Sequence, residues 1–267
     1  MTVHSCGKPI AHINGRTYKD ALRELGGDEK SIRRDQLTDW VAVCPRCDRL
    51  KLGATRAVGW PFRDADGVMR TVHDHDGLEL CAGSETMSFG GFLFSRRAFE
   101  AGVHLARTGD PTTPTVEAIG RDFLARPTTE GARAFCEAVC VWGRGQRVLG
   151  KLSAFHGDAL GTHVHDWLVR VPDLDPVDAV AAGIEIRGLA VSFASKHLRL
   201  LQPERFPVLD EVLEAGLGIA RNPAGYRLFT CMLSDFLAEH QLQETIAVAE
   251  GAIFMLVRQG VRAVDEN

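Results

Sequence analysis

Apolar residues recur at intervals of three and four positions through most of the chain after residue 90, and this helical period constrains the fold more than any other sequence feature. Residues that commonly start helices stand where periodic segments begin, as at Ser95, Thr128 and the Asp175–Pro176 pair. The sequence therefore predicts a bundle of helices. The expected helices span residues 95–107, 114–126, 128–142, 145–155, 161–171, 176–184, 189–201, 208–217, 223–240 and 242–260.

The residues before about position 85 differ from the rest because they are rich in Gly, Cys, His and Asp and show only weak periodicity. Strand-like pieces occur at 39–44 and 68–73, and one helix is expected at 17–25. We predict a mainly α protein in two parts: a small N-terminal zinc-binding α+β module over residues 1–88 and an all-α domain over residues 89–267. No long Gly/Ser linker separates the two parts, so we expect them to pack together.

Length and charge narrow the setting of the protein. A chain of 267 residues, 45% of them apolar, can bury one large core or two modest ones. No run of about eighteen apolar residues is present, so no membrane span or membrane partner is expected. Residues 1–15 lack the basic-then-apolar order of a signal peptide, which predicts a cytoplasmic protein with reduced cysteines. The net charge of −4 counts against a broadly basic nucleic-acid surface but allows a local one.

The strongest local motif is the cysteine pair in 44-CPRC-47, followed by a histidine and a cysteine in 73-HDHDGLELC-81. Two cysteines at this spacing form one side of a tetrahedral zinc site, and a hairpin can return a second pair of ligands. A module with few large apolar residues gains stability from such a metal. The predicted ligands of a structural zinc ion are Cys44, Cys47, Cys81 and either His73 or His75, with the spacing favouring His73.

This arrangement resembles a small zinc-binding motif of bacterial and phage proteins, in which CPxC is followed by a His and then by a CpGS element. Here 81-CAGS-84 has Ala in place of Pro. The rival ligands are Cys6, His4 and His12. The CxxC pair could also be two buried free thiols with no metal.

Cysteines and histidines farther along the chain are interpreted without a metal. Cys136 and Cys140 lie four positions apart on a predicted helix among Ala, Val and Phe, so they are interpreted as core thiols. Cys231 is interpreted in the same way. Surface or capping roles are expected for His156, His163 and His165.

The region from 176 to 210 carries the features that point to a function. Gly188 stands at a tight turn between two predicted helices, which is the shape of a helix-hairpin-helix. Such a turn aims backbone N–H groups and a helix N-terminus at a phosphate, and it binds the DNA backbone without reading sequence. The apolar phrase 206-FPVLD-210 then ends on an acid that opens the next predicted helix.

This stretch resembles the helix-hairpin-helix and catalytic region of base-excision DNA glycosylases, the superfamily of 8-oxoguanine and adenine-mismatch glycosylases. Gly188 and Ala190 stand at the two glycines of the family's GxG hairpin, and Ser192 stands at its key position. Asp210 follows at the family's usual spacing, within a phrase of the family's type. Ala190 departs from the pattern. The phrase 142-WGRGQR-147 resembles a WGxG phrase of compact, defence-associated proteins with the 8-oxoguanine-glycosylase fold.

The resemblance implies hydrolytic removal of a damaged or modified base from DNA. Asp210 would stabilise positive charge on the sugar or activate water, with Ser192 or Lys196 as its partner. A deprotonated Lys196 could instead attack the sugar and form a Schiff base. The cysteine loop that holds an iron–sulfur cluster in some members is missing, because only Cys231 lies downstream, so no such cluster is expected. The implied setting is phage defence or a mobile element more than housekeeping repair.

The implied substrate is double-stranded DNA from which the target base is flipped out. The residues expected to contact DNA are Gly188, Ala190, Trp142 and Arg144, with Arg147 as a further phosphate contact. Stacking on the flipped base is left open among Trp142, Trp167 and Phe155. The identity of the base and the oligomeric state stay open.

Simpler roles compete with each catalytic assignment. Asp210 is a good N-cap by itself, Lys196 could be a solvated lysine, and Ser192 could bond to a carbonyl in the preceding turn. The alternatives for the whole protein are a non-catalytic DNA- or RNA-binding adaptor that keeps the fold, and a nuclease or toxin that depends on Mg²⁺.

Overall fold

Helices make up most of the described chain. A computed structural model describes residues 86–90 and 92–258, together with short strands on either side of this range. The α-helices are α2 (Arg96–Thr108), α3 (Thr113–Ala125), α4 (Thr129–Trp142), α5 (Gln146–His156), α6 (Leu160–Leu168), α7 (Pro176–Ile184), α8 (Val191–Leu201), α9 (Glu211–Leu217), α10 (Pro223–Glu239) and α11 (Ile246–Arg258). Two 3₁₀ turns are η1 (Gly157–Ala159) and η2 (Val171–Asp173). The mainly α class predicted from the apolar period is confirmed.

The strands are short and form small sheets. They are β1 (Thr2–Val3), β2 (Pro9–Ile10), β3 (Val41–Val43), β4 (Leu50–Leu52), β5 (Pro61–Arg63), β6 (Met69–Thr71), β7 (Thr86–Phe89), β8 (Phe92–Ser95) and β9 (Val261–Ala263). Antiparallel pairs join β1 to β2, β5 to β6 and β7 to β8, while β3 lies between antiparallel β4 and parallel β9. The strand-like pieces predicted at 39–44 and 68–73 contain β3 and β6. The helix expected at 17–25 lies outside the described residues, and the domain boundary at residue 88 stays a prediction.

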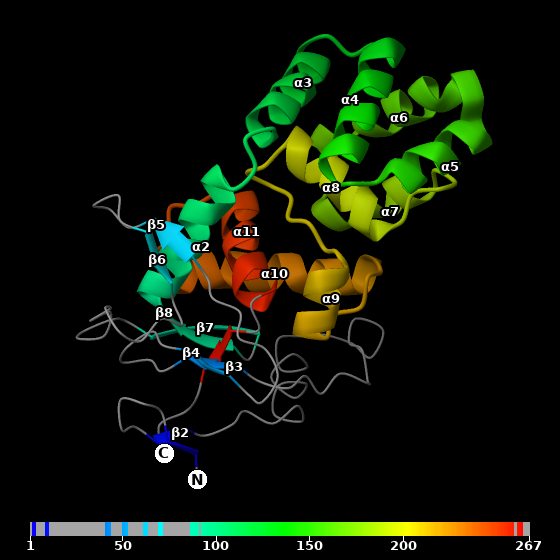
Figure 1. Ribbon diagram of the computed structural model, residues 1–267. Helices are drawn as coiled ribbons and strands as arrows, with labels where there is room; N and C mark the ends of the chain where they lie inside the picture. Colours follow the sequence, from blue (N-terminus) through cyan, green and yellow to red (C-terminus); the bar gives the residue numbers. More distant parts are fainter. Residues whose placement is uncertain are drawn as a thin grey trace.

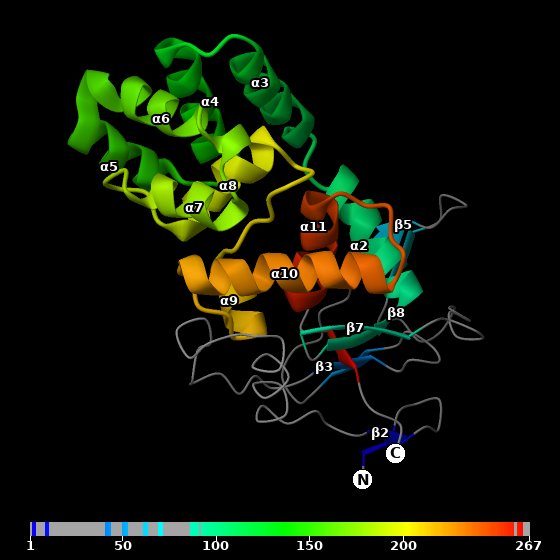
Figure 2. The ribbon, with the colours of Figure 1, turned by 180° about the vertical axis from the view of Figure 1, so that it is seen from behind.

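The helices divide into two lobes, which both views of the ribbon separate (Figures 1 and 2). The upper lobe holds α3 to α8. The lower lobe holds α2, α9, α10 and α11, with β7 and β8 beside them. Contacts run from α2 to α11 and from α9 to α11 within the lower lobe, and from α7 to α10 between the lobes. The upper lobe is therefore inserted between α2 and α9, and the chain crosses between lobes at residues 109–112 and 202–210.

Polar caps explain where several helices begin. Thr128 accepts a hydrogen bond from the N–H of Gly131 at 3.0 Å, and Asn222 accepts one from the N–H of Gly225 at 2.8 Å. Asp175 caps α7 in the same manner. A side-chain oxygen at this position satisfies an N–H group that has no partner within the helix, and this stabilises the helix by about 1 kcal/mol. The start signals predicted at Thr128 and Asp175 are confirmed.

A single apolar core runs through both lobes. Its largest fully buried side chains include Phe135 in the upper lobe and Phe206, Tyr226 and Phe229 at or below the crossing. The Tyr226 hydroxyl donates a hydrogen bond to the carbonyl of Pro207 at 3.1 Å, which satisfies the buried phenol. This contact holds residues 202–210, called the crossing segment below, against α10. The position of Asp210 at the end of this segment is therefore fixed.

The helix boundaries differ from the sequence prediction by a few residues, and one difference matters for the site. The second helix of the hairpin was expected from residue 189, whereas α8 begins at Val191. Ala190 is its extended N-cap, and Gly188 lies in the turn before it. Within the described residues, we find no helix with both the length and the apolar character that crossing a membrane requires.

Candidate active site at the boundary of the lobes

A turn that contains Gly188 joins α7 to α8. Gly188 has a φ of +105°, a left-handed value that a side chain would strain, so glycine suits this turn. Ala190 is exposed and extended with a φ of −122°, and α8 starts immediately after it. The turn therefore leaves the N-terminus of α8 at the surface, where the first N–H groups of a helix favour an anion.

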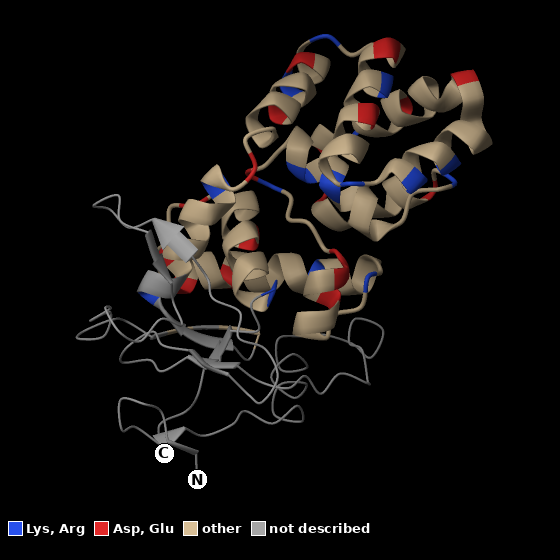
Figure 3. Ribbon diagram, viewed as in Figure 1, with Lys and Arg blue, Asp and Glu red and all other residues tan. Residues whose placement is uncertain are grey.

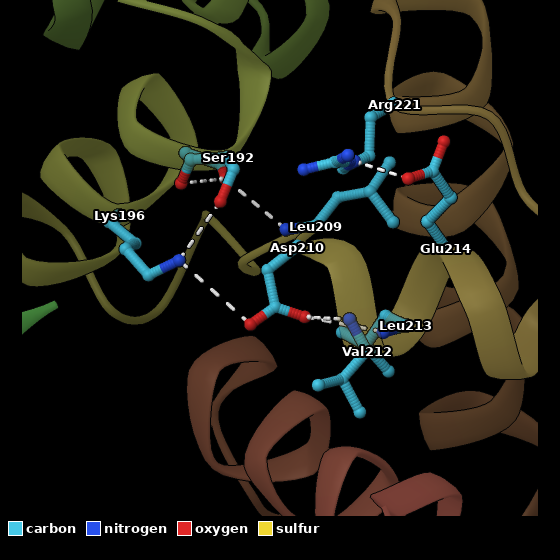
Figure 4. A network of polar contacts seen from close by, with 9 residues as sticks. Ser192, Lys196, Leu209, Asp210, Val212, Leu213, Glu214 and Arg221 are labelled. Carbon is cyan, nitrogen blue, oxygen red and sulfur yellow. Dashed lines mark hydrogen bonds and ion pairs between the residues drawn. The ribbon is translucent and has the colours of Figure 1, made fainter. Parts of the chain in front are cut away.

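Lys196 of α8 meets Asp210 across the boundary between the lobes. The Lys196 Nζ atom lies 3.9 Å from Asp210 Oδ2 and donates a hydrogen bond to Ser192 Oγ at 3.0 Å (Figure 4). The side chain of Lys196 is 11% exposed and that of Asp210 is 19% exposed. Lys196 is therefore not the solvated surface lysine that the sequence also allowed, and the structure brings together the three residues predicted to be catalytic.

The two carboxylate oxygens of Asp210 contact different partners. Oδ1 accepts hydrogen bonds from the N–H groups of Val212 at 3.0 Å and Leu213 at 3.2 Å, so Asp210 is the N-cap of α9. Oδ2 faces Lys196 (Figure 4). The capping role and the paired role are thus compatible, because the cap uses one oxygen and leaves the other directed at the amine.

A second serine on α8 fixes the approach of the crossing segment. Ser195 is fully buried, and its hydroxyl donates to the carbonyl of Ser192 at 3.1 Å while it accepts from the N–H of Leu209 at 3.2 Å. The bond to a carbonyl in the preceding turn, which the sequence allowed for Ser192, is thus made by Ser195. Leu209 directly precedes Asp210, so this contact holds the carboxylate opposite Lys196.

At this boundary, burial and neighbouring charges shift the pKa values of Lys196 and Glu250 in opposite directions. Burial lowers the pKa of Lys196, and the nearby carboxylates of Asp210 and Glu250 oppose that shift. Glu250 of α11 is buried, and this burial raises its pKa from 4.5 to about 8, with Arg199 as the main opposing charge. The N–H of Val208 donates to Glu250. A buried carboxyl on the lower lobe therefore faces the same cluster as Asp210.

Arginine pairs lie on both sides of the lysine. Arg199 Nη1 donates to Glu117 Oε1 at 2.9 Å, and its guanidinium lies 5.5 Å from the centre of the Trp142 ring. Arg221 pairs with Glu214 next to α9 (Figure 4). These pairs balance charge around a partly buried site.

The WGRG phrase lies directly against α8. A Cβ added at Gly145 would stand 2.2 Å from the Phe193 ring, and one added at Gly143 would stand 3.0 Å from Lys196 Cδ. The glycines of this phrase therefore allow the α4–α5 turn to approach the helix that carries Lys196. Arg144, between them, is exposed and has a φ of +55°.

The aromatic candidates for base stacking occupy three different environments. Trp167 is buried, and its Nε1 donates to the carbonyl of Ala179 at 2.9 Å, so it belongs to the core. Trp142 is half-buried, and its Nε1 donates to Thr113 Oγ1 at 2.8 Å. Phe155 is 44% exposed and lies under the guanidinium of Arg187 at 4.1 Å. Of the three rings, Phe155 has the most open surface.

Basic residues lie along the edge of the upper lobe that faces the lower lobe (Figure 3). Arg144, Arg147 and Arg187, from α5 and the turns near it, are exposed. Although the whole chain has a net charge of −4, this edge is locally basic, as the sequence allowed.

The predicted zinc ligands Cys44, Cys47, His73 and Cys81 lie outside the described residues, and so do His75 and the rival Cys6. A different group is described in the upper lobe, where the ligand atoms of Cys136, Cys140 and His197 lie within 4.8 Å of one another. Cys136 and Cys140 are buried as predicted. Cys231 is exposed, so its interpretation as a core thiol was wrong: it lies on the outer face of α10.

Two residues of the site were not foreseen. Ser195 follows Ser192 by three positions and belongs to the phrase 192-SFASK-196, so its spacing was a usable signal. Glu250 offered a weaker one, an acid in the otherwise apolar run 246-IAVAEGAIFM-255. Only the tertiary fold brings α11 to the crossing segment.

Comparison of the chain with protein-family models, with curated proteins and with solved structures found no match.

Proposed function

We propose that the protein removes a damaged or modified base from DNA, with Lys196 and Asp210 as its catalytic pair. The observation that carries this proposal is the separation of 3.9 Å between Lys196 Nζ and Asp210 Oδ2, where two lobes meet. A lysine amine can attack a sugar carbon and a carboxylate can accept a proton, so two neighbouring side chains of these types supply the two groups that base removal needs. Ser192 orients the amine through the hydrogen bond to its hydroxyl.

The chemistry follows from the two groups. The neutral Lys196 amine attacks the anomeric carbon, and the base leaves with the electron pair of the glycosidic bond and takes up a proton. Asp210 stabilises the positive charge that develops on the sugar and accepts the proton that the amine gives up. Opening of the sugar ring gives a Schiff base, and water then releases Lys196. The balanced outcome is one free base and one abasic site for each water molecule consumed.

The surroundings of the pair support a DNA substrate. The Gly188 turn presents a helix N-terminus at the surface, and Ala190 is exposed beside it. Arg144 is exposed in the turn that packs against α8, where its charge would attract a phosphate backbone. Phe155 offers an exposed ring near the hairpin for a flipped base.

We also propose that Cys44, Cys47, His73 and Cys81 hold a structural zinc ion. The support for this site is the spacing of these residues in the sequence. In this view the zinc stabilises the N-terminal residues and takes no part in base removal.

Base release from defined duplexes tests the proposal. Duplexes that each carry one oxidised, alkylated, deaminated, mismatched or phage-type modified base are incubated with the full chain, and free base is measured by mass spectrometry. One duplex is expected to release its base. Lys196→Gln should lose this release, whereas Lys151→Gln, which changes an exposed lysine of α5, should keep it.

Other outcomes favour the alternatives. Binding of DNA without base release from any duplex indicates an adaptor. Strand breaks that need added Mg²⁺ and show no abasic intermediate indicate a nuclease. Equal release by Lys196→Gln and the unchanged chain would mean that the lysine and aspartate form only a structural ion pair.

A further inference from the structure

Three ligand-type side chains meet inside the upper lobe, away from the lysine–aspartate pair. Cys136 and Cys140 lie one turn apart on α4, and His197 lies on α8. Their ligand atoms are within 4.8 Å of one another, and all three residues are 0% exposed. Two sulfur atoms and an imidazole are the donors that zinc prefers in proteins.

The hydrogen bond of His197 occupies one ring nitrogen and leaves the other able to bind a metal. Its Nδ1 atom lies 2.7 Å from the carbonyl of Phe193, so Nδ1 carries the proton and donates it. The lone pair is then on Nε2, which is buried and has no hydrogen-bond partner among the described residues. Metal-bound histidines are commonly fixed by such a bond from the other ring nitrogen. A buried nitrogen without a partner is otherwise unfavourable.

We infer that Cys136, Cys140 and His197 bind a Zn²⁺ ion. Two thiolates neutralise the charge of Zn²⁺, which suits a site shielded from water by the Phe135 and Trp167 rings beside His197. Binding forms two Zn–S bonds and one Zn–N bond, and the two thiol protons leave to solvent. Bonds of about 2.3 Å to sulfur and about 2.0 Å to nitrogen bring the ligand atoms closer to one another than the present limit of 4.8 Å, so the side chains must shift when the ion binds.

This ion would tie α4 to α8 immediately beside the proposed catalytic pair. His197 directly follows Lys196 in the chain, and its Phe193 partner packs against the glycines of the WGRG phrase. The metal therefore fixes the rotation of α8 from within the upper lobe. The inference does not depend on the proposed function, because the site is defined by its own three ligands.

Zinc content tests the site in the full chain. After equilibrium dialysis against Zn²⁺, bound zinc is measured by mass spectrometry for the unchanged chain and for His197→Phe and Cys136→Ala. Each of these variants is expected to bind one equivalent less than the unchanged chain. The matched controls His163→Phe and Cys231→Ala change exposed residues of the same types and should lose none. Equal zinc content in all five proteins would overturn the inference.

A second measurement avoids substitution in the core, where a variant can fail to fold. The unchanged chain is loaded with ¹¹³Cd²⁺, and correlations between cadmium and protein protons are recorded by NMR. Cross-peaks to the β-protons of Cys136 and Cys140 and to a ring proton of His197 are expected. Absence of a cadmium resonance coupled to these residues would overturn the inference, even if cysteines before residue 85 bind the metal.

Discussion

Two neighbouring residues of α8, Lys196 and His197, face opposite kinds of surroundings. Lys196 is directed across the boundary of the lobes, where Asp210 and Ser192 surround its amine and some solvent reaches it. His197 is directed into the upper lobe, where Cys136 and Cys140 lie nearby and no solvent reaches it. One helix thus carries a group suited to exchange a proton beside a group suited to hold a metal.

The difference shows that adjacent residues of one short helix can have different roles. Successive residues of a helix point about 100° apart, so adjacent positions serve different faces. The face that carries Lys196 depends on the segment 202–210 that crosses between the lobes, whereas the face that carries His197 packs against α4 and α6 of its own lobe. Changes at the boundary should therefore affect chemistry, and changes inside the upper lobe should affect stability and metal content.

The largest change in base release is expected from a substitution at Asp210 that removes its charge and keeps its capping role. Asp210→Asn keeps an N-cap oxygen for α9 but removes the carboxylate, so base release should fall by about 10²- to 10⁴-fold while the free energy of unfolding changes by about 1 kcal/mol or less. Asp175→Asn is the matched control, because Asp175 caps α7 through the same two kinds of bond without a lysine beside it. Similar rates of base release for the two variants would show that the Asp210 carboxylate takes no part in the reaction.

The second prediction concerns the pH dependence of stability at the boundary. The folded-state pKa of Glu250 is about 8 against an ordinary value of 4.5, so its protonated form is favoured by folding. Its stabilising contribution is complete below pH 4.5 and is lost as pH rises through about 8. The expected loss is on the order of a few kcal/mol.

Denaturant unfolding across this pH range measures the loss. Glu250→Gln should flatten the decline and should be more stable than the unchanged chain above pH 8. Glu239→Gln, an exposed glutamate at the end of α10, should leave the decline as it is. The same decline in Glu250→Gln would show that other groups cause it.

A third prediction tests the close approach of the WGRG phrase to α8. Gly145→Ala places a methyl group against the Phe193 ring, so it should destabilise the protein by about 1–3 kcal/mol and reduce base release as well. Gly150→Ala, in the interior of α5 with open space around it, should instead stabilise by about 0.5–1 kcal/mol. Thermal melts of the two variants check the opposite signs, and matching shifts would contradict the packing described here.

The smallest expected effect is the change in the free energy of unfolding when the N-cap of α9 at Asp210 is lost. Asp210→Ala should unfold about 1 kcal/mol more easily than Asp210→Asn, because alanine cannot accept from Val212 and Leu213. The corresponding difference at Asp175 should be similar. A much larger difference at Asp210 would mean that the crossing segment moves when the cap is lost.

The helices were predictable because their apolar residues follow a local period. Thr128 and Asp175 marked real starts, and the Gly188 turn lies where the sequence placed it. The start of α8 was placed too early, since Leu189 is buried in the turn and its apolar character alone does not make it helical. Local rules give such boundaries only to within a few residues.

The site was predictable in part. The family-like phrase brought Ser192, Lys196 and Asp210 into view together, and the structure brings them into contact. The contacts of Glu250 and of His197 could not be predicted from the sequence, because their partners come from helices far apart in the chain. Tertiary packing alone creates these contacts.

Borohydride trapping shows whether Lys196 forms a Schiff base with the sugar. The full chain is incubated with the duplex whose base it releases, sodium borohydride is added, and any covalent protein–DNA adduct is located by peptide mass spectrometry. An adduct on Lys196 is expected, which Lys196→Gln lacks and Lys151→Gln retains. Base release without an adduct, or an adduct on another residue, would contradict the role given to Lys196.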